Sequence, residues 1–152
     1  MTEINVLSDG NCLFRCIASF LDNKFEIAER FKNGRIKARK LDEYETENAK
    51  AFRIVTIEAM KAQKEKYSND IIYNDTELYE NIDIRIGKMS SHDELAGLLE
   101  LKVLSKILKM KFNIYVKRFA PEYNLVACVG KKYTKRCNLL LEDDHYKLII
   151  WS

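Results

Sequence analysis

The sequence predicts a mixed α/β domain of the α+β type, in which helices flank a small, mostly antiparallel sheet. Hydrophobic spacing is helical over about the first two-thirds of the chain, whereas the last third holds short β-branched or aromatic runs. The 152 residues are 47% hydrophobic and 32% charged, and no Pro/Gly/Ser-rich linker divides them. We therefore expect residues 1–152 to form one domain.

Three helices are predicted in the first two-thirds of the chain. Residues 12–21 are almost wholly apolar and follow a turn-forming Ser-Asp-Gly-Asn segment, which predicts a buried helix with Cys12 at its N-terminus. The pattern from about residue 42 to residue 67, acidic early and lysine-rich late, predicts a long amphipathic helix. A further helix is expected to begin at the S-x-x-E capping box of residues 91–94 and to run to about residue 110.

The last third of the chain predicts a meandering sheet. Short apolar runs alternate there with loops that carry Pro121, Gly130 and an acidic pair. A short N-terminal strand is also expected around residues 4–7. The four predicted C-terminal strands are residues 112–116, 123–129, 137–141 and 146–151.

The charge balance argues against a dedicated nucleic-acid-binding domain. Lys and Arg number 26 against 23 Asp and Glu, a net charge of +3 that falls short of the strongly basic footprint of such domains. Basic residues gather in segments 29–40 and 131–136, which we interpret as a solvated face and a charged hairpin loop. No stretch approaches the ~18 apolar residues of a membrane span. We expect neither nucleic acid nor a membrane as partner.

Four cysteines without an N-terminal apolar leader indicate free thiols in a reducing, cytoplasmic compartment rather than a secreted disulfide framework. A zinc set drawn from Cys12, Cys16, Cys128 and Cys137 is disfavoured, since C-x₃-C on a helix is not the usual knuckle spacing and no histidine is close. We expect no metal. Cys16, Cys128 and Cys137 are interpreted as structural.

Cys12 is the candidate nucleophile, because the amides and dipole of a helix N-terminus favour the thiolate. The tight Asp9-Gly10 turn before it would aim the backbone N–H groups of Gly10, Asn11 and Cys12 at a common point, where an oxyanion could sit. The alternative is a simple turn with an N-cap, in which Cys12 is a small buried hydrophobe.

A catalytic thiol needs a base, and the sequence contains two histidines, His92 and His145. His145 opens the last strand, directly after Asp143 and Asp144, whose carboxylates could tune or orient its ring. His92 lies in the first turn of the predicted capped helix and is interpreted as solvated or capping. His145 is therefore the candidate base.

Three segments, taken in order, resemble the OTU (ovarian tumour) cysteine proteases, most of which are deubiquitinases. Residues 9–17, DGNCLFRCI, are similar to the nucleophile segment D-G-N-C-[LF]-[FY]-x-[SA]-[IL], with Cys16 as the departure. Residues 95–105, LAGLLELKVLS, resemble W-G-G-x-x-E-x-x-x-L-[AS] and precede an I-x-V strand. His145-Tyr146 resembles the closing H-Y-[DN] segment. The likeness extends over nearly the whole chain.

The resemblance implies a papain-like fold and hydrolysis of isopeptide bonds at the C-terminal glycine of ubiquitin or a ubiquitin-like modifier. It makes Cys12 the nucleophile, His145 the general base and later acid, and Asp9 the acidic member of the nucleophile loop. It implies no cofactor, and a monomer whose partner is ubiquitin or polyubiquitin. The Lys/Ile/Asn-rich composition suggests a virus or an intracellular bacterium, which would place the protein in a host cytosol.

Two departures from the family pattern leave alternatives open. Lys147 stands where many members place the Asp or Asn that orients the histidine, and an ammonium cannot accept a hydrogen bond. Asp143, Asp144, Asn5 or another residue of the N-terminal strand could take that role, or the enzyme could work as a dyad. Leu-Ala at residues 95–96 replaces Trp-Gly near the substrate channel. A catalytically weak or inactive ubiquitin-binding module is the alternative function, and Lys147 favours it.

Overall fold

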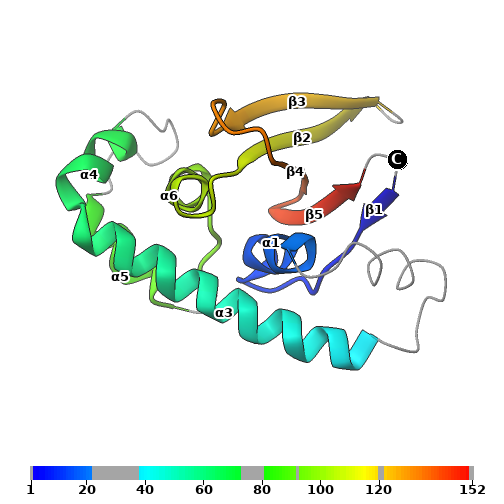
Figure 1. The fold of residues 1–152 in the computed structure, drawn as a ribbon, viewed down its shortest axis with the longest axis horizontal. Coiled ribbons are helices and arrows are strands. Elements are labelled where there is room, and N and C mark those ends of the chain that lie inside the picture. The colour runs from blue at the N-terminus through cyan, green and yellow to red at the C-terminus, as the bar shows by residue number, and fades with distance from the viewer. Residues whose placement is uncertain (1, 22–37, 73–80, 92, 120–121, 151–152) are drawn as a thin grey trace.

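The structure, a computed structural model, describes residues 2–21, 38–72, 81–91, 93–119 and 122–150. In this part of the chain, helices lie around a five-stranded sheet (Figure 1). The helices are α1 (Cys12–Leu21), α3 (Ala38–Ala62), α4 (Lys64–Ile72), α5 (Ile82–Met89) and α6 (Leu98–Leu108). The strands are β1 (Thr2–Ile4), β2 (Lys111–Phe119), β3 (Glu122–Val129), β4 (Arg136–Glu142) and β5 (His145–Ile150).

The sheet has the order β1-β5-β4-β2-β3 and is antiparallel except for the pair β2–β4. The predicted class and the mostly antiparallel sheet are confirmed, but the predicted meander is wrong. Because β2 lies between β3 and β4, the connection of residues 130–135 crosses over β2 and is not a hairpin loop. At the other edge β1 pairs with β5, with Thr2 opposite Ile150, so the first and last strands lie side by side there (Figure 1).

The long amphipathic segment forms two helices, α3 and α4, which are separated at Gln63. Helix α5 was not predicted. Its isoleucines at positions 82, 84 and 86 alternate as in a strand, yet the helix buries Ile82, Ile86 and Met89 and leaves Ile84 exposed. The side chain of Asn81 caps α5 by accepting a hydrogen bond from the Ile84 N–H at 2.9 Å.

The helix expected from the 91–94 capping box begins at Leu98 instead. The carbonyl groups of Ser91 and Glu94, which would start a helical ladder, accept hydrogen bonds from the buried Arg53 at 3.0 and 2.7 Å. These tertiary hydrogen bonds to Arg53 take the place of the first turn of the helix that the local sequence predicts. The segment between α5 and α6 is therefore extended and held by the Arg53 guanidinium group.

Helix α6 is anchored by a buried ion pair between Arg85 and Glu100. Nε of Arg85 lies 3.3 Å from Oε2 of Glu100, and Oε1 of Glu100 accepts the Gly97 N–H at 2.7 Å. Oε1 of Glu94 lies 3.2 Å from Nη1 of Arg85, so Glu94 forms a second ion pair with Arg85 instead of capping a helix. The glutamate of the 95–105 segment thus caps α6 and holds it against α5.

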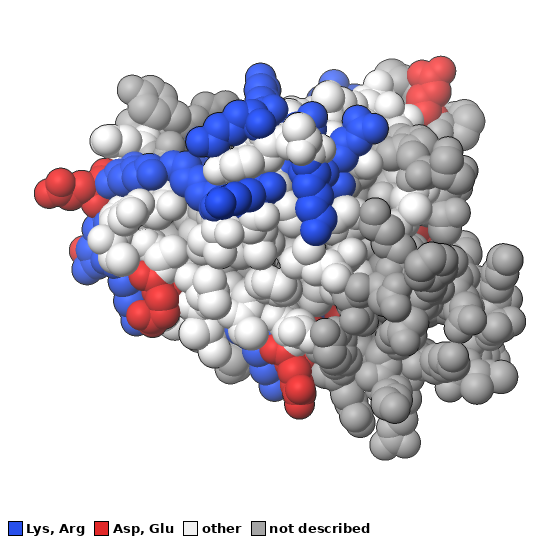
Figure 2. Space-filling model, viewed as in Figure 1, with Lys and Arg blue, Asp and Glu red and all other residues white. Residues whose placement is uncertain are grey.

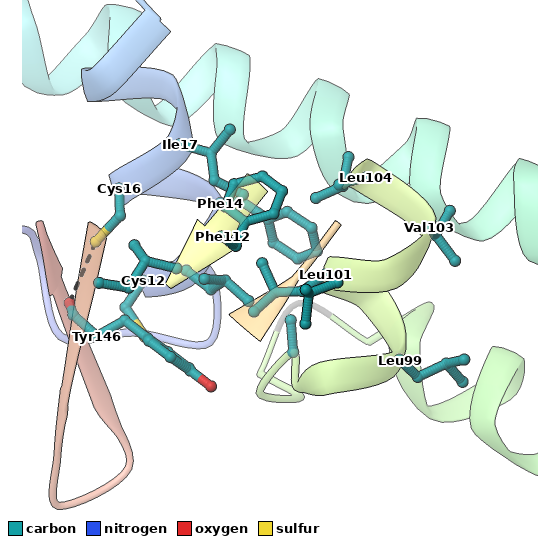
Figure 3. Packing of buried hydrophobic residues seen from close by; sticks show 14 of the residues in the cluster. Cys12, Phe14, Cys16, Ile17, Leu99, Leu101, Val103, Leu104, Phe112 and Tyr146 are labelled. Carbon is teal, nitrogen blue, oxygen red and sulfur yellow. Dashed lines mark hydrogen bonds between the residues drawn. The ribbon is translucent and has the colours of Figure 1, made fainter. Parts of the chain in front are cut away.

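The core lies between α1, α6 and the sheet. Phe14 and Ile17 of α1 are fully buried, as are Leu101 and Leu104 of α6 and Phe112 of β2 (Figure 3). Burial of such side chains contributes about 1.5–3 kcal/mol each, so the helix that begins at Cys12 is held firmly from within. None of the described helices combines the length and hydropathy needed to cross a membrane.

Lysine and arginine side chains gather across one part of the surface, above α6 and the β3–β4 connection (Figure 2). Lys131, Lys132 and Lys135 of this connection are exposed, as the charge pattern predicts. The other predicted basic face, residues 29–40, lies outside the described residues except for the backbone of residues 38–40 in α3.

Candidate active site

Cys12 is the first residue of α1, and its side chain is on the side of the helix that faces β5 (Figure 3). The residue is only 1% exposed. Burial raises the pKa of the Cys12 thiol, hydrogen bonds from the backbone N–H groups of Tyr146 and Leu13 partly offset this, and the charge of Asp9 adds to it. Desolvation therefore favours the neutral thiol over the thiolate and outweighs the dipole effect expected from the sequence.

The Asp9 carboxylate fixes the loop before Cys12. Its oxygens lie 3.1 Å from Nε and 2.9 Å from Nη2 of Arg15, and Oδ1 also accepts the Asn11 N–H at 3.1 Å. Arg15 is held in turn by Thr46, whose Oγ1 accepts from Nη1 at 2.7 Å, and by Glu45 at 3.8 Å. Asp9 is therefore placed to position the loop rather than to orient His145.

Arg53 of α3 holds the same loop from the other side and is 2% exposed. It donates to Oδ1 of Asn11 at 2.6 Å and to the carbonyl of Gly10 at 2.7 Å, and it lies 5.1 Å from the centre of the Phe14 ring. It also donates to the carbonyl of Met89 at the end of α5 and to two carbonyls between α5 and α6. Sequence reasoning missed Arg53, although it stands in the buried stripe of α3 between Ala49 and Ile57.

The amides expected to form an oxyanion hole are partly engaged within the loop. The Asn11 N–H donates to Oδ1 of Asp9, and the Cys12 N–H donates to the Asp9 carbonyl at 3.2 Å. The Gly10 N–H has no hydrogen-bond partner among the residues that the structure describes. In this conformation Gly10 is the donor that is already available.

His145 begins β5, and its Nε2 lies 2.8 Å from Oδ1 of Asn5. With the amide oxygen as acceptor, the proton of the neutral ring is on Nε2. Nδ1 is buried and has no hydrogen-bond partner in the described part of the chain, so its lone pair is available. Burial lowers the pKa of His145, and the charge of Lys147 lowers it further against the opposing charges of Asp9 and Glu142.

The backbone of Tyr146 connects the two candidate residues. A hydrogen bond from this backbone lowers the pKa of the Cys12 thiol against the effect of burial. The Tyr146 carbonyl accepts the Cys16 thiol at 3.4 Å (Figure 3). Since Tyr146 directly follows His145, this strand brings the nucleophile candidate to the start of β5, where the base candidate lies. The pKa of Cys12 is raised and the pKa of His145 is lowered, and both directions favour the neutral forms of the pair.

The two carboxylates that could orient His145 make no hydrogen bond to its ring in the part of the chain that the structure describes. Asp143 and Asp144 form the two-residue turn between β4 and β5, with φ angles of 48° and 61°, and their side chains are exposed. This turn geometry requires positive φ at both positions, which accounts for the acidic pair structurally. Lys147 pairs with Glu142 at 3.4 Å. His92 lies outside the described residues.

The remaining cysteines are free thiols, as is Cys12. Cys16 and Cys137 are fully buried in the core, as expected of structural residues, and Cys128 is partly exposed on β3. No group of three or more His, Cys, Asp or Glu side chains in the described ranges could hold a metal ion.

Comparison with protein families matches residues 7–142 to the model of OTU-like cysteine proteases. Among solved structures, the viral OTU domain protease from Qalyub virus is 16% identical with a TM-score of 0.62, covering 98% of this chain and 83% of that one. The structure of the Hazara virus OTU bound to ubiquitin is 16% identical with a TM-score of 0.64, covering 99% of this chain and 82% of that one. At these identities the likeness establishes the fold.

A bacterial structure is also similar. The OTU deubiquitinase from Wolbachia pipientis wMel, solved bound to ubiquitin, is 12% identical with a TM-score of 0.63, covering 97% of this chain and 94% of that one. A search of curated protein sequences found no match.

Proposed function

The chain belongs to the family of OTU-like cysteine proteases, and from this premise we propose that it is a deubiquitinase. The proposed reaction is thiol-dependent hydrolysis of the isopeptide bond at the C-terminal glycine of ubiquitin or a ubiquitin-like modifier. Structures of similar fold from Hazara virus and Wolbachia hold ubiquitin, which supports this substrate class. The observation that carries the proposal is that Nδ1 of His145, at the start of the strand that contacts Cys12, has no hydrogen-bond partner among the described residues.

The neutral resting pair suits general-base attack. His145 takes the thiol proton through Nδ1 as Sγ of Cys12 attacks the glycine carbonyl carbon, a contribution worth about 10²–10⁴ in rate. The tetrahedral intermediate then collapses: the C–N bond breaks, and the lysine amine leaves with the proton from His145. Water, deprotonated by the same imidazole, hydrolyses the thioester and releases the ubiquitin carboxylate and the Cys12 thiol.

The nucleophile loop supplies the oxyanion donors in this proposal. The Gly10 N–H donates first, and the Cys12 N–H exchanges its 3.2 Å bond to the Asp9 carbonyl for one to the oxyanion. Asp9, held by Arg15, keeps the loop in place during the exchange. Each such donor contributes about 10²–10³ in kcat in acyl-transfer enzymes.

A ubiquitin-binding module without catalytic activity is the second candidate. Lys147 favours it, because no acceptor stands two residues after His145. The two candidates differ in covalent chemistry, since a binding module forms no thioester.

The test is a ubiquitin probe with a C-terminal electrophile, together with a fluorogenic ubiquitin substrate. We expect labelling and turnover in the wild type, loss of both in Cys12→Ala, loss of turnover in His145→Ala, and unchanged behaviour in the matched control Cys128→Ser. Turnover that survives Cys12→Ala or His145→Ala refutes the proposal. Tight ubiquitin binding without labelling identifies the binding module.

A further inference from the structure

Asn5 directly follows β1, the strand that pairs with β5. Glu3 lies opposite Ile149, and Ile4 lies opposite Leu148. Side chains alternate between the two faces of a sheet, so Asn5 is on the same face as Glu3 and His145. Its Oδ1 is the atom that lies 2.8 Å from Nε2 of His145.

On this face one side chain from each of the five strands joins a polar cluster, which we call the outer-face cluster: Glu3, Lys117, Tyr123, Glu142 and Lys147. Nζ of Lys117 lies 2.6 Å from Glu3 and 3.3 Å from Glu142, and Tyr123 donates to Glu3. Lys147 lies 3.4 Å from Glu142 and 3.9 Å from Glu3. The cluster therefore ties β1 to the rest of the sheet.

The charges of the cluster are only partly solvated, because the four ionic side chains are 24–33% exposed. Although burial acts in the opposite direction, hydrogen bonds from Lys117 and Tyr123 hold the pKa of Glu3 below its usual range. Glu3 receives contacts from three members of the cluster, Lys117, Tyr123 and Lys147. It also lies two residues before Asn5, which directly follows this strand.

Lys147 stands at the position expected to orient the histidine, but its ammonium group is directed to the two glutamates of the cluster. The ring is instead hydrogen-bonded to Asn5, the residue directly after the N-terminal strand. An amide oxygen at Nε2 fixes the tautomer that leaves the lone pair on Nδ1, which is the form a base needs.

We propose that Asn5 is the positioning residue of His145, and that the outer-face cluster clamps the strand that presents it. Asn5 acts through the imidazole and does not touch substrate. The expected effect of Asn5 on kcat rests on the proposed function. The expected effect of Asn5 on the tautomer of His145 does not depend on a substrate.

The tautomer of His145 provides the first test, by long-range ¹H–¹⁵N correlation spectra at a pH where the ring is neutral. The variant His92→Gln leaves one histidine to assign. We expect a dominant Nε2–H form in this background and a mixture of tautomers when Asn5→Ala is added. An unchanged tautomer in Asn5→Ala overturns the inference.

Kinetics provide the second test. Asn5→Ala should lower kcat on the fluorogenic ubiquitin substrate by about tenfold or more, with KM little changed, because proton transfer and not binding is affected. Asn5→Asp should restore kcat, since a carboxylate accepts the same hydrogen bond. Its negative charge should also move the acid limb of the pH profile to higher pH. Equal loss in the two variants contradicts a positioning role.

The clamp is tested with Glu3→Gln, which keeps the shape of the side chain and removes the charge that both lysines face. We expect a partial shift of the His145 tautomer in the same direction as Asn5→Ala, and faster amide exchange in residues 2–5. Glu122→Gln, an exposed glutamate of β3 outside the cluster, is the matched control. If Glu3→Gln leaves both the His145 tautomer and the amide exchange of residues 2–5 unchanged, the role proposed for the outer-face cluster is refuted.

The outcomes separate the two proposals. A wild type that cleaves no ubiquitin substrate, together with a tautomer shift in Asn5→Ala, refutes the proposed function and keeps the role of Asn5. A wild type that cleaves ubiquitin, together with an Asn5→Ala variant in which neither the tautomer nor kcat changes, supports the proposed function and refutes the role of Asn5.

Discussion

Nη2 of Arg53 lies 2.7 Å from the carbonyl oxygen of Gly10, so the long helix α3 directly holds the loop that precedes the nucleophile. The same guanidinium accounts for the extended path of the segment between α5 and α6. Its partners are backbone carbonyls and the Asn11 amide, and burial lowers the pKa of Arg53. One buried arginine therefore organises two neighbouring loops of the site.

Arg53→Met should be strongly destabilising, because the side chain fits the space but leaves several buried carbonyl groups without donors. We expect a loss of about 3–5 kcal/mol in the free energy of unfolding. Denaturation in urea measures it. Arg118→Met, an exposed arginine of β2, is the matched control and should stay within about 0.5 kcal/mol of the wild type. Similar small effects in both variants would show that the Arg53 contacts contribute little.

Lys147→Asn should leave activity equal to or higher than that of the wild type. Lys117 makes the shorter contacts of the outer-face cluster, so the clamp persists, and an amide now stands where the family orients its histidine. Because burial and the Lys147 charge lower the pKa of His145, removal of this charge raises that pKa. On acidification, His145 of the variant is therefore protonated, and stops acting as a base, at a higher pH than in the wild type.

The pH profile of kcat/KM measures this change. The acid limb should lie below the ordinary histidine value of about 6.5 in the wild type and move upward in Lys147→Asn. Lys131→Asn, in the exposed β3–β4 connection, is the control and should leave the limb unchanged. A large loss of activity in Lys147→Asn would reveal a positive role for this lysine.

The parts of the fold that depend on local sequence could be predicted. The bounds of α1 follow from an apolar run after a turn. The bounds of β3, β4 and β5 lie within one residue of those expected, whereas β2 continues to Phe119, beyond its expected end at residue 116. The pairing of β4 with β2 could not be predicted, because strand runs do not specify their partners. The start of α6 was missed because Arg53, distant in sequence, takes the carbonyl groups that a local cap would have used.

The candidate site divides in the same way. Cys12 and His145 were selected from sequence, because nucleophile and base chemistry restricts the residue types. Asn5 was one of several open alternatives, and its 2.8 Å hydrogen bond to the ring depends on the pairing of β1 with β5. Arg53 was missed, since an arginine within an apolar helical stripe is a signal only when the acceptors around it are known.

Gly130→Ala should destabilise the fold. Gly130 has a φ of 76°, and a Cβ atom there would lie 2.6 Å from the Met110 carbonyl oxygen and also meet Ser105. Strained φ and close backbone contact together cost about 1–3 kcal/mol. Gly87→Ala is the control: no atom lies within 4 Å of the added Cβ in helix α5, so a gain of about 0.5–1 kcal/mol is expected. Thermal or urea unfolding of the pair measures both effects, and equal signs would contradict the geometry.

Asp9→Asn should lower the pKa of Cys12, because burial and the Asp9 charge both raise it. The alkylation rate of Cys12 by iodoacetamide rises with the thiolate fraction, so its midpoint should lie above the ordinary thiol value of about 8.5 in the wild type and fall in the variant. The buried Arg15 loses its ion pair with Asp9, and the loop that it fixes loosens. We therefore expect kcat to decrease even though the Cys12 thiolate forms at a lower pH in the variant. Asp93→Asn, exposed near α6, is the control. An alkylation midpoint that does not move would mean that the Asp9 charge is screened from the thiol.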